Sequence, residues 1–336
     1  MAYTTIDNPE LYFQVKTYTG TGSSNALTLD GDENMQPDYV MIKQRSSTQQ
    51  WNGYDDLRGV QKYLGWNTDI LENTQTQGLT AFGSDGFTVG TDDMVNKSSS
   101  TYVAYCWKEA SGIFDMVLYT GNGSNRTISH SLSATPDLVI TKRRDNTGNW
   151  MVGGSTTLGG DNKLLLLDTT AALDDNSEVY QSFSSSTFGI GVNAYINTNT
   201  STYISYLFSS KQGYSKISSF VGNGSTDGTF VYTGFRPAFV MCKRTDSTGS
   251  WYICDIKRVG YNGRPNNSAT VGNPELAAQS NRSEAGGNTN VMDIFSNGFK
   301  LIQSGAEINA SGGTFIFMAF AESSFVNSKG VPCNAR

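Results

Sequence analysis

Alternating apolar and polar positions predict β-strands along most of the chain. In the stretch YVMIK, Val40 and Ile42 would face one side of an extended backbone. Tyr39, Met41 and Lys43 would face the other side, because successive side chains of a strand alternate. Both faces are apolar in the longer stretches TYVAYCW, TYISYLF and TFIFMAF, which predicts central strands. Helical periodicity is weak, and the helix candidates are the short stretches DLRGVQKYL and NPELAAQ.

Turn signals connect the predicted strands. Thr-Gly pairs mark hairpin turns that join PDLVITKRR to NWMVGG, and PAFVMCKR to the stretch that follows it. The same eight-residue step leads from a lysine to a tryptophan in three places: Lys43 and Trp51, Lys142 and Trp150, and Lys243 and Trp251. Each lysine should therefore lie across the turn from its tryptophan, with its aliphatic stem packed on the indole ring.

A period of 101 residues runs through the chain. YTGTG at 18–22 returns as YTGNG at 119–123 and as FVGNG at 220–224. The third closing stretch, TFIFMAF, comes about eleven residues later than this period requires. The surplus lies in the polar, turn-rich stretch 262–288, which predicts a surface loop. The glycines of the repeated motif are expected at corners where a Cβ atom would clash.

A repeated unit of about 100 residues has the size of a domain and exceeds that of a solenoid repeat. Seven or eight short strands in such a unit suit two packed antiparallel sheets. We therefore predict an all-β protein of three tandem antiparallel β-sandwich domains, jelly-roll-like and related by the internal repeat. The predicted division is an N-terminal arm 1–15, sandwiches 16–111, 112–212 and 213–325, the last with the inserted loop 262–288, and a C-terminal tail 326–336.

Composition and charge exclude several classes of protein. Charged residues make up only 16%, the net charge is −6 and no long Lys/Arg run occurs, so no nucleic-acid partner is expected. Aromatic residues make up 12%, which is enough to build cores and argues against disorder. No apolar run has the length of a membrane span, and the start MAYTTIDNPELYFQ lacks the basic and apolar regions of a signal peptide.

Side chains with obvious chemistry are scarce. The four cysteines, Cys106, Cys242, Cys254 and Cys333, lack the spacing of a zinc site, and His130 is the only histidine. Cys242 and Cys254 flank one hairpin turn, which leaves open a disulfide or two reduced, buried thiols. We expect the thiols, because free cysteine behaves as a small apolar residue. His130 is expected to be structural.

Carboxylates and glycines form no recognisable site. DGDEN at 30–34 offers several oxygens but lacks the rest of a calcium loop, so a solvated turn is expected, and Asp92 and Asp93 are a weaker candidate. The glycine-rich corners lack the Lys-Ser/Thr of a phosphate loop, and no two carboxylates stand out as glycosidase partners. We expect no enzyme, no cofactor, and no catalytic or metal-binding residues. Binding residues stay unidentified at this stage.

The three recurring tryptophans admit two interpretations. Exposed indoles beside Asn and Asp could serve as sugar-stacking platforms. Alternatively, Trp51, Trp150 and Trp251 pack against their own hairpins in the domain cores. Their single fixed offset from a lysine favours the core.

The order of motifs YTGNGS, PDLVITKRR, GNW, SDGF and TYVAYCWKE, with the ending MAFAESSFVNSKGVPCNAR, resembles a domain found in tandem in virion proteins of marine tailed phages. The resemblance covers nearly the whole chain. It implies a virion protein of the tail-fibre or structural type, assembled in the host cytoplasm and released by lysis. The third copy departs from the pattern, since Asp38 and Asp137 are matched by Ala238. Any shared role of those aspartates should be absent there.

The resemblance predicts a non-enzymatic virion structural protein, associated with a tail fibre or baseplate or serving host attachment. The alternatives are a capsid decoration protein and a carbohydrate-binding or carbohydrate-active module. The implied partners are other virion proteins of the tail, baseplate or capsid, with a homo-oligomer and a host-surface glycan as further candidates. Neither nucleic acid nor membrane insertion is expected.

The joins between the repeated units are short. Each contains one glycine, Gly112 or Gly213, which is too little for a flexible linker. Neighbouring units should keep one fixed relation, which leaves open a pseudo-threefold disc or a rod. We favour the disc, since tails and capsids offer threefold and sixfold seats. The arm 1–15 and the tail would then be free to dock on neighbours, and the loop 262–288 is the preferred candidate for a specific contact.

Overall fold

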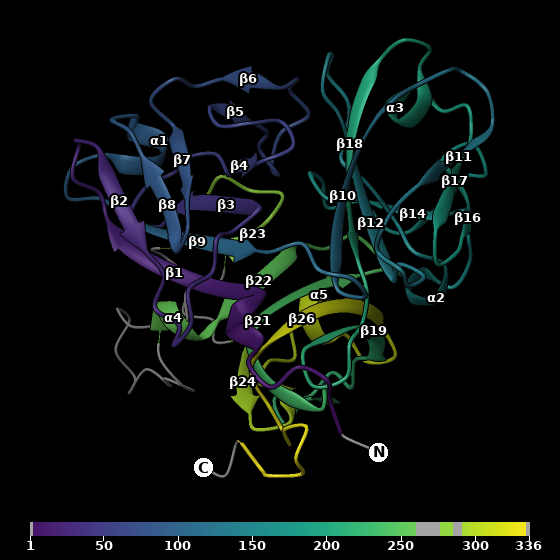
Figure 1. Cartoon of the computed structure of the whole chain (residues 1–336). Coiled ribbons are helices and arrows are strands. Elements are labelled where there is room, and N and C mark those ends of the chain that lie inside the picture. Colours follow the sequence, from purple (N-terminus) through teal and green to yellow (C-terminus); the bar gives the residue numbers. More distant parts are fainter. Residues whose placement is uncertain (1–2, 260–275, 285–290, 334–336) are drawn as a thin grey trace.

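The computed structural model describes residues 3–259, 276–284 and 291–333, and all structural statements refer to these. Antiparallel β-sheets dominate the chain, and the α-helices are single turns. The prediction of an all-β fold built from antiparallel sandwiches is confirmed. For the description that follows, the predicted sandwiches are called segment 1 (16–111), segment 2 (112–212) and segment 3 (213–325). Figure 1 shows them as lobes grouped around a common centre.

One large sheet belongs to each segment. The sheet of segment 1 has the order β1 (Phe13–Thr19), β9 (Thr101–Trp107), β3 (Tyr39–Gln44) and β4 (Asn52–Asp55). The sheet of segment 2 has the order β10 (Phe114–Thr120), β18 (Thr202–Phe208), β12 (Leu138–Arg143), β13 (Met151–Gly153), β14 (Lys163–Leu166) and β15 (Asp174–Asp175). The sheet of segment 3 has the order β19 (Ser215–Val221), β26 (Thr314–Ser324), β21 (Phe235–Arg244), β22 (Trp251–Asp255) and β23 (Leu276–Ala277). The stretches predicted as central strands, β9, β18 and β26, each lie between two neighbours.

A smaller three-stranded sheet covers one face of each large sheet. These sheets have the orders β2 (Asn25–Thr28), β8 (Gly86–Val89), β7 (Leu79–Gly83); β11 (Arg126–Ser129), β17 (Thr187–Ile190), β16 (Tyr180–Phe183); and β20 (Phe230–Tyr232), β25 (Gly298–Leu301), β24 (Met292–Phe295). Segment 1 also contains the short pair β5 (Lys62–Tyr63) and β6 (Asn73–Thr74). The same strand connection therefore occurs in all three segments. That each segment is a domain of its own stays a prediction.

The helices lie elsewhere than the sequence suggested. The described helices are η1 (Pro9–Leu11), α1 (Asp93–Asn96), α2 (Ser155–Leu158), α3 (Ala194–Asn197), α4 (Ile256–Val259) and α5 (Ala306–Asn309). The expectation of a helix in DLRGVQKYL is wrong, because this stretch forms a turn that leads into β5. Of NPELAAQ, the described residues include β23 and no helix.

Each large sheet is buried on both faces. Val40 and Ile42 of β3 pack into a core that belongs to segment 1 alone. Tyr39 and Met41, on the opposite face, pack into a second core to which all three segments contribute. The predicted alternation along YVMIK is thus confirmed, and β12 and β21 alternate in the same way. The outer cores make the sandwiches, whereas the central core joins them.

The repeated glycine motif forms a corner that a buried asparagine holds in place. A Cβ atom on Gly121 would lie 2.2 Å from the carbonyl oxygen of Thr198, and Gly123 has a φ of +71°. The Asn197 side chain accepts a hydrogen bond from the Asn122 amide and donates to the carbonyls of Ser124 and Gly191. Asn96 and Asn309 hold the corners of the other segments in the same way. The corner role of the glycines, predicted from sequence, is confirmed.

The N-terminal arm is attached to its own chain. The Tyr3 hydroxyl donates to the carbonyl oxygen of Gly234 at 2.6 Å, and the Thr4 hydroxyl donates to that of Gln212 at 2.7 Å. Asp7 accepts hydrogen bonds from the amide and hydroxyl of Ser328, in the C-terminal tail. The expectation that arm and tail are free to dock elsewhere is wrong for these residues, because their polar groups already have partners within the chain.

Substituting Asn197 with alanine should destabilise the fold strongly. The change leaves one backbone amide and two carbonyls of the corner without their partner, so we expect a loss of roughly 3 kcal/mol in the free energy of unfolding. Urea unfolding followed by circular dichroism measures the loss. The neighbouring Asn199 is exposed, and its alanine variant should unfold like the parent chain. Equal behaviour of the two variants would contradict the proposed role of the corner.

Candidate functional site

The three recurring tryptophans connect the segments to one another. Their indole N–H groups donate to backbone carbonyls of a neighbouring segment: Trp51 to Ala277 and Ser280, Trp150 to Gly65 and Thr68, and Trp251 to Leu166. Segment 1 thus contacts segment 3, segment 2 contacts segment 1, and segment 3 contacts segment 2. The three contacts close a ring, which is the disc arrangement and not the rod.

All three tryptophans are fully buried, at 0 or 1% exposure, so these indoles cannot stack on a sugar. The interpretation as core residues is confirmed. Their core, however, is the central one shared by all segments, and the expectation that each packs only in its own domain is wrong. The reason is the second apolar face of each large sheet, which the segment's own small sheet does not cover.

The recurring lysines lie beside these contacts. Lys243 is the cross-strand partner of Trp251, as the hairpin predicted. Its ammonium donates to the carbonyl of Arg244 at 2.6 Å and lies 3.5 Å from that of Thr170 in segment 2. Lys142 makes the same contacts with Arg143 and with Asp69 of segment 1. Burial lowers the pKa of these two lysines and of Lys43 to about 8.

Carboxylates occupy the two covalent joins. Asp38 accepts a hydrogen bond from the backbone amide of Glu109 at 2.7 Å, where segment 1 passes into segment 2. Asp137 accepts one from the amide of Ser210 at 2.7 Å, where segment 2 passes into segment 3. Segment 3 holds Ala238 at the matching position. The expectation that the third copy lacks the aspartate's role agrees with this geometry.

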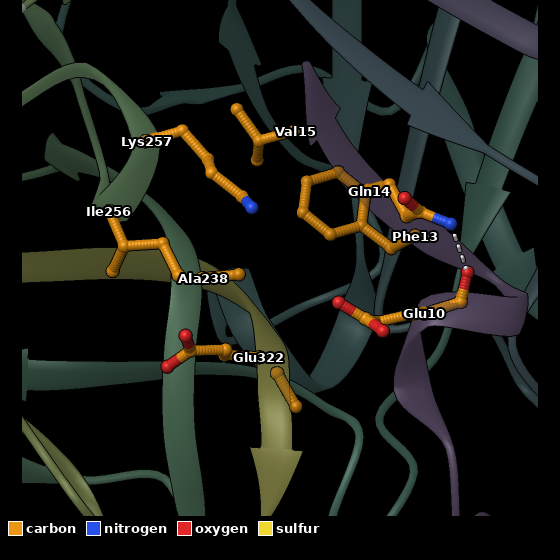
Figure 2. Close-up of a pocket in the computed structure, with 9 residues that line it drawn as sticks. Glu10, Phe13, Gln14, Val15, Ala238, Ile256, Lys257 and Glu322 are labelled. Atoms are coloured by element: carbon orange, nitrogen blue, oxygen red, sulfur yellow. Dashed lines mark hydrogen bonds between the residues drawn. The ribbon is translucent and has the colours of Figure 1, made fainter. Parts of the chain in front are cut away.

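A hollow lies at the seam between segment 3 and the N-terminal strand (Figure 2). Figure 2 shows the Lys257 side chain pointing toward Phe13, with Glu10 and Glu322 below. The hollow has a volume of about 30 Å³, which holds a water molecule or two, since one water needs about 10–15 Å³. Ala238 lines it, at the position where the covalent joins place an aspartate. The hollow is therefore too small for an organic ligand.

The remaining sequence candidates have structural partners. His130 is half-buried, with Nε2 3.2 Å from the carbonyl of Ser184, and burial lowers its pKa. Asp30 of the DGDEN turn forms an exposed ion pair with Lys16. Asp92 caps α1 by accepting from the amide of Met94. In the part of the chain that the structure describes, no group of three or more metal-binding side chains comes together.

The cysteines are free thiols. Cys106, Cys242 and Cys254 are buried, whereas Cys333 is exposed. Cys242 lies opposite Tyr252 in the hairpin and Cys254 lies opposite Val240, so the two thiols are not direct cross-strand partners. The expectation of reduced, buried thiols at Cys242 and Cys254 is confirmed.

An aromatic patch lies on the outer sheet of segment 3. It consists of Phe230 and Tyr232 of β20 and Phe295 of β24, which are 45, 52 and 40% exposed. The rings of Phe230 and Phe295 meet edge to face at 6.0 Å, across the bare backbone of Gly298. Large apolar side chains that gather on a surface typically mark an interaction site.

The other two segments lack this aromatic patch. Strand register places Leu27, Ile128 and Val231 opposite the equivalent Phe87, Phe188 and Phe299. The outward neighbours are Ala26 and Thr28 in segment 1 and Thr127 and Ser129 in segment 2. In segment 3 they are Phe230 and Tyr232. Phe295 likewise takes the place of Gly83 and Ser184. The patch is therefore specific to segment 3 and is not required by the shared fold.

The loop 262–288, preferred at first for a specific contact, lies largely outside the described residues. Of its described part, Glu284 forms an ion pair with Arg45 of segment 1 at 2.6 Å. This contact belongs to the interface between segments.

Comparison with known proteins identifies a family. A family described as a domain of unknown function (DUF7483) matches residues 8–324, which is nearly the whole chain. The chain belongs to the DUF7483 family. A search of curated proteins finds no match. No helix in the described part of this DUF7483 member is both long enough and apolar enough to cross a membrane.

Sequence reasoning missed the corner asparagines and the aromatic patch of this DUF7483 chain. The corner asparagines Asn96, Asn197 and Asn309 each stand five residues before the first threonine of a closing stretch, and this recurrence was available as a signal. The aromatic patch was detectable as the replacement of small side chains by Phe230 and Tyr232 in the third copy. Alternation alone did not separate outward positions from buried ones there, because both are apolar.

The free energy of unfolding should depend on pH through Glu109, which lies at the join between segments 1 and 2. Burial raises the pKa of Glu109 to about 7, and Asp115, Asp38 and Asp56 add to this. The folded state therefore binds the Glu109 proton more tightly than the unfolded state does. The contribution of protonated Glu109 to the free energy of unfolding is complete below about pH 4.5 and is lost as the pH rises through 7.

The Glu109→Gln variant keeps an acceptor for the Met116 amide, which now donates to Glu109 at 2.7 Å, but it cannot ionise. Its free energy of unfolding should exceed that of the parent chain above pH 7, and the difference should shrink toward pH 5. Urea titrations at several pH values measure this, with the exposed Glu178→Gln as the control. A difference that does not change with pH would contradict the assignment.

Proposed function

We propose that this DUF7483 chain is a non-enzymatic structural protein of a phage virion, in a tail-fibre, baseplate or host-attachment part. The observation that carries the proposal is a closed ring of three similar segments with one distinctive outer surface. The aromatic residues of the shared core are buried inside the ring, and the exposed aromatic patch on segment 3 is the contact surface offered to a partner.

The interior of the ring supports a scaffolding role. Tryptophans, lysines and tyrosines meet at the seams and are hydrogen-bonded there to backbone or carboxylate groups. Buried polar groups with fixed partners specify one arrangement of the segments. A rigid body of this kind suits a particle in which copies must dock in one geometry.

The outer surface supports attachment through segment 3. Tyr and Phe are enriched in protein interfaces, where they supply large contact areas with few side-chain torsions to fix. The patch lies close to the arm, since the hydroxyls of Tyr3 and Tyr232 are 3.4 Å apart. The proposed occupant is another virion protein, assembled with this chain in the host cytoplasm. A host-surface glycan is the competing partner.

Mass spectrometry of particles purified from lysed host cells tests the virion assignment. The chain should be found at a fixed stoichiometry to the tail proteins, and gold-labelled antibodies should mark one place on each particle. A chain that stays in the soluble lysate and is absent from particles would refute the assignment. Hydrolysis of a host polysaccharide by the purified chain would favour the carbohydrate-active alternative.

The aromatic patch should be required for incorporation but not for folding. A triple variant, Phe230→Thr, Tyr232→Ser and Phe295→Ser, gives segment 3 the side chains that segment 2 has at these positions. Its incorporation into particles should fall at least tenfold, which corresponds to about 1.4 kcal/mol of docking free energy. Its unfolding midpoint should change little, because the three side chains are exposed.

The matched control for the triple variant changes the equivalent surface of segment 2, with Thr127→Ala and Ser129→Ala. Incorporation of this control should equal that of the parent chain. Full incorporation of the triple variant would show that the aromatic patch is not the docking surface. Loss of glycan binding with unchanged incorporation would assign the patch to the glycan.

A further inference from the structure

The interface between segments 1 and 2 contains a buried charged contact. Segment 1 contributes a triad, Asp55, Arg58 and Glu72, and segment 2 contributes a pair, Arg144 and Tyr206. Arg58 Nε lies 2.5 Å from Asp55 Oδ2, and both side chains are fully buried. Arg144 Nε lies 2.8 Å from Glu72 Oε2. The Tyr206 hydroxyl donates to Asp55 Oδ2 at 2.7 Å.

The interface between segments 3 and 1 contains the same contact. Here segment 3 contributes the triad Asp255, Arg258 and Glu284, and segment 1 contributes the pair Arg45 and Tyr105. Arg258 and Asp255 form a fully buried ion pair, and Arg258 Nη1 lies 3.0 Å from Glu284 Oε1. Arg45 Nε reaches Glu284 Oε2 at 2.6 Å, and the Tyr105 hydroxyl donates to Asp255 at 2.8 Å.

The third interface, between segments 2 and 3, has neutral residues at all five positions. Counted from the recurring tryptophan, Gly154 and Thr157 replace the aspartate and the arginine of the triad. Thr245, two residues after the recurring lysine, replaces the arginine of the pair. Met318 of the closing strand β26 replaces the tyrosine of the pair, and it is the cross-strand partner of Met241. Leu173 replaces the glutamate.

Backbone contacts place Leu173 and Thr245 opposite each other. The Leu173 amide donates to the carbonyl of Thr245 at 2.9 Å. The Glu72 amide donates to Arg144 at 2.8 Å and the Glu284 amide donates to Arg45 at 2.8 Å in the same manner. The backbone geometry of the three interfaces is thus alike, and only the side chains differ between charged and neutral.

Energetics explain why the residues must change together. Removing one partner of a buried ion pair leaves an uncompensated charge, which costs more than replacing both partners by neutral groups. Although burial alone would raise the pKa of Glu72, its hydrogen bonds with Arg144 and the charge of Arg58 hold the pKa below its ordinary value. A neutral partner opposite Glu72, such as the threonine that segment 3 carries, would leave this carboxylate without its main stabilising contact.

We propose that these five positions determine which segment docks on which, by matching a charged pair to a charged triad and a neutral pair to a neutral triad. The neutral side chains of segment 3 fit only the neutral site of segment 2. The charged pairs of segments 1 and 2 are excluded from that site, because Arg45 or Arg144 would there face Leu173. The proposal concerns ring assembly and is independent of the virion assignment.

A double-mutant cycle in the full chain tests the proposal. Arg144→Thr and Glu72→Leu give the first interface the residues of the third. Each single variant should lower the urea midpoint by roughly 1 M, because it leaves a partly buried charge unmatched. The double variant should recover most of the loss. If Glu72→Leu fails to fold, Glu72→Gln replaces it in the cycle and keeps the test possible.

The reverse cycle and a mismatched pair complete the test. Leu173→Glu and Thr245→Arg should each destabilise the third interface and should rescue each other. Glu72→Leu combined with Thr245→Arg places the two changes in different interfaces, and this combination should show no rescue. Additive losses in both matched cycles, or equal rescue by the mismatched pair, would overturn the proposal. Rescue confined to matched pairs supports it.

Discussion

The structure depends on one constraint: each large sheet is apolar on both faces, and a segment can cover only one of them. The three-stranded sheets bury the outer faces. The inner faces, with Tyr39, Leu138 and Phe239, can be buried only against one another. The indole N–H groups of the recurring tryptophans fix the distance and rotation of this packing by donating to the neighbour's backbone. Closure into a ring follows, because a rod would expose inner faces at both ends.

The backbone contacts are alike at the three interfaces of the ring, but the side chains of the segments differ at a few positions. Ala238 stands in segment 3 where segments 1 and 2 have the join aspartates Asp38 and Asp137. Neutral residues replace the charged contact at one of the three interfaces. The aromatic patch gives one segment an outer surface that the others lack. The three segments therefore differ in side chains at the join position, at one interface and on one exposed sheet.

Much of this fold could be predicted from the sequence. Alternation along YVMIK assigned both faces of β3, and the double-sided apolar stretches identified β9, β18 and β26 as central strands. The fixed lysine-to-tryptophan step found the seam residues but not their partners, because spacing along the chain contains no information on contacts such as that of Trp150 with Gly65. The charged triads were missed because Asp55 and Arg58, three residues apart, look like an exposed helical pair in the sequence, whereas both side chains are fully buried in the structure.

Small-angle X-ray scattering of the purified chain tests closure of the ring most directly. A compact chain of 336 residues should have a radius of gyration of about 20 Å. Three domains in a line, each with a radius of gyration of about 13 Å, would give roughly 30 Å and an elongated distance distribution. A value near 20 Å, unchanged on dilution, is the expected result. A value near 30 Å would contradict the shared central core and every contact across the seams.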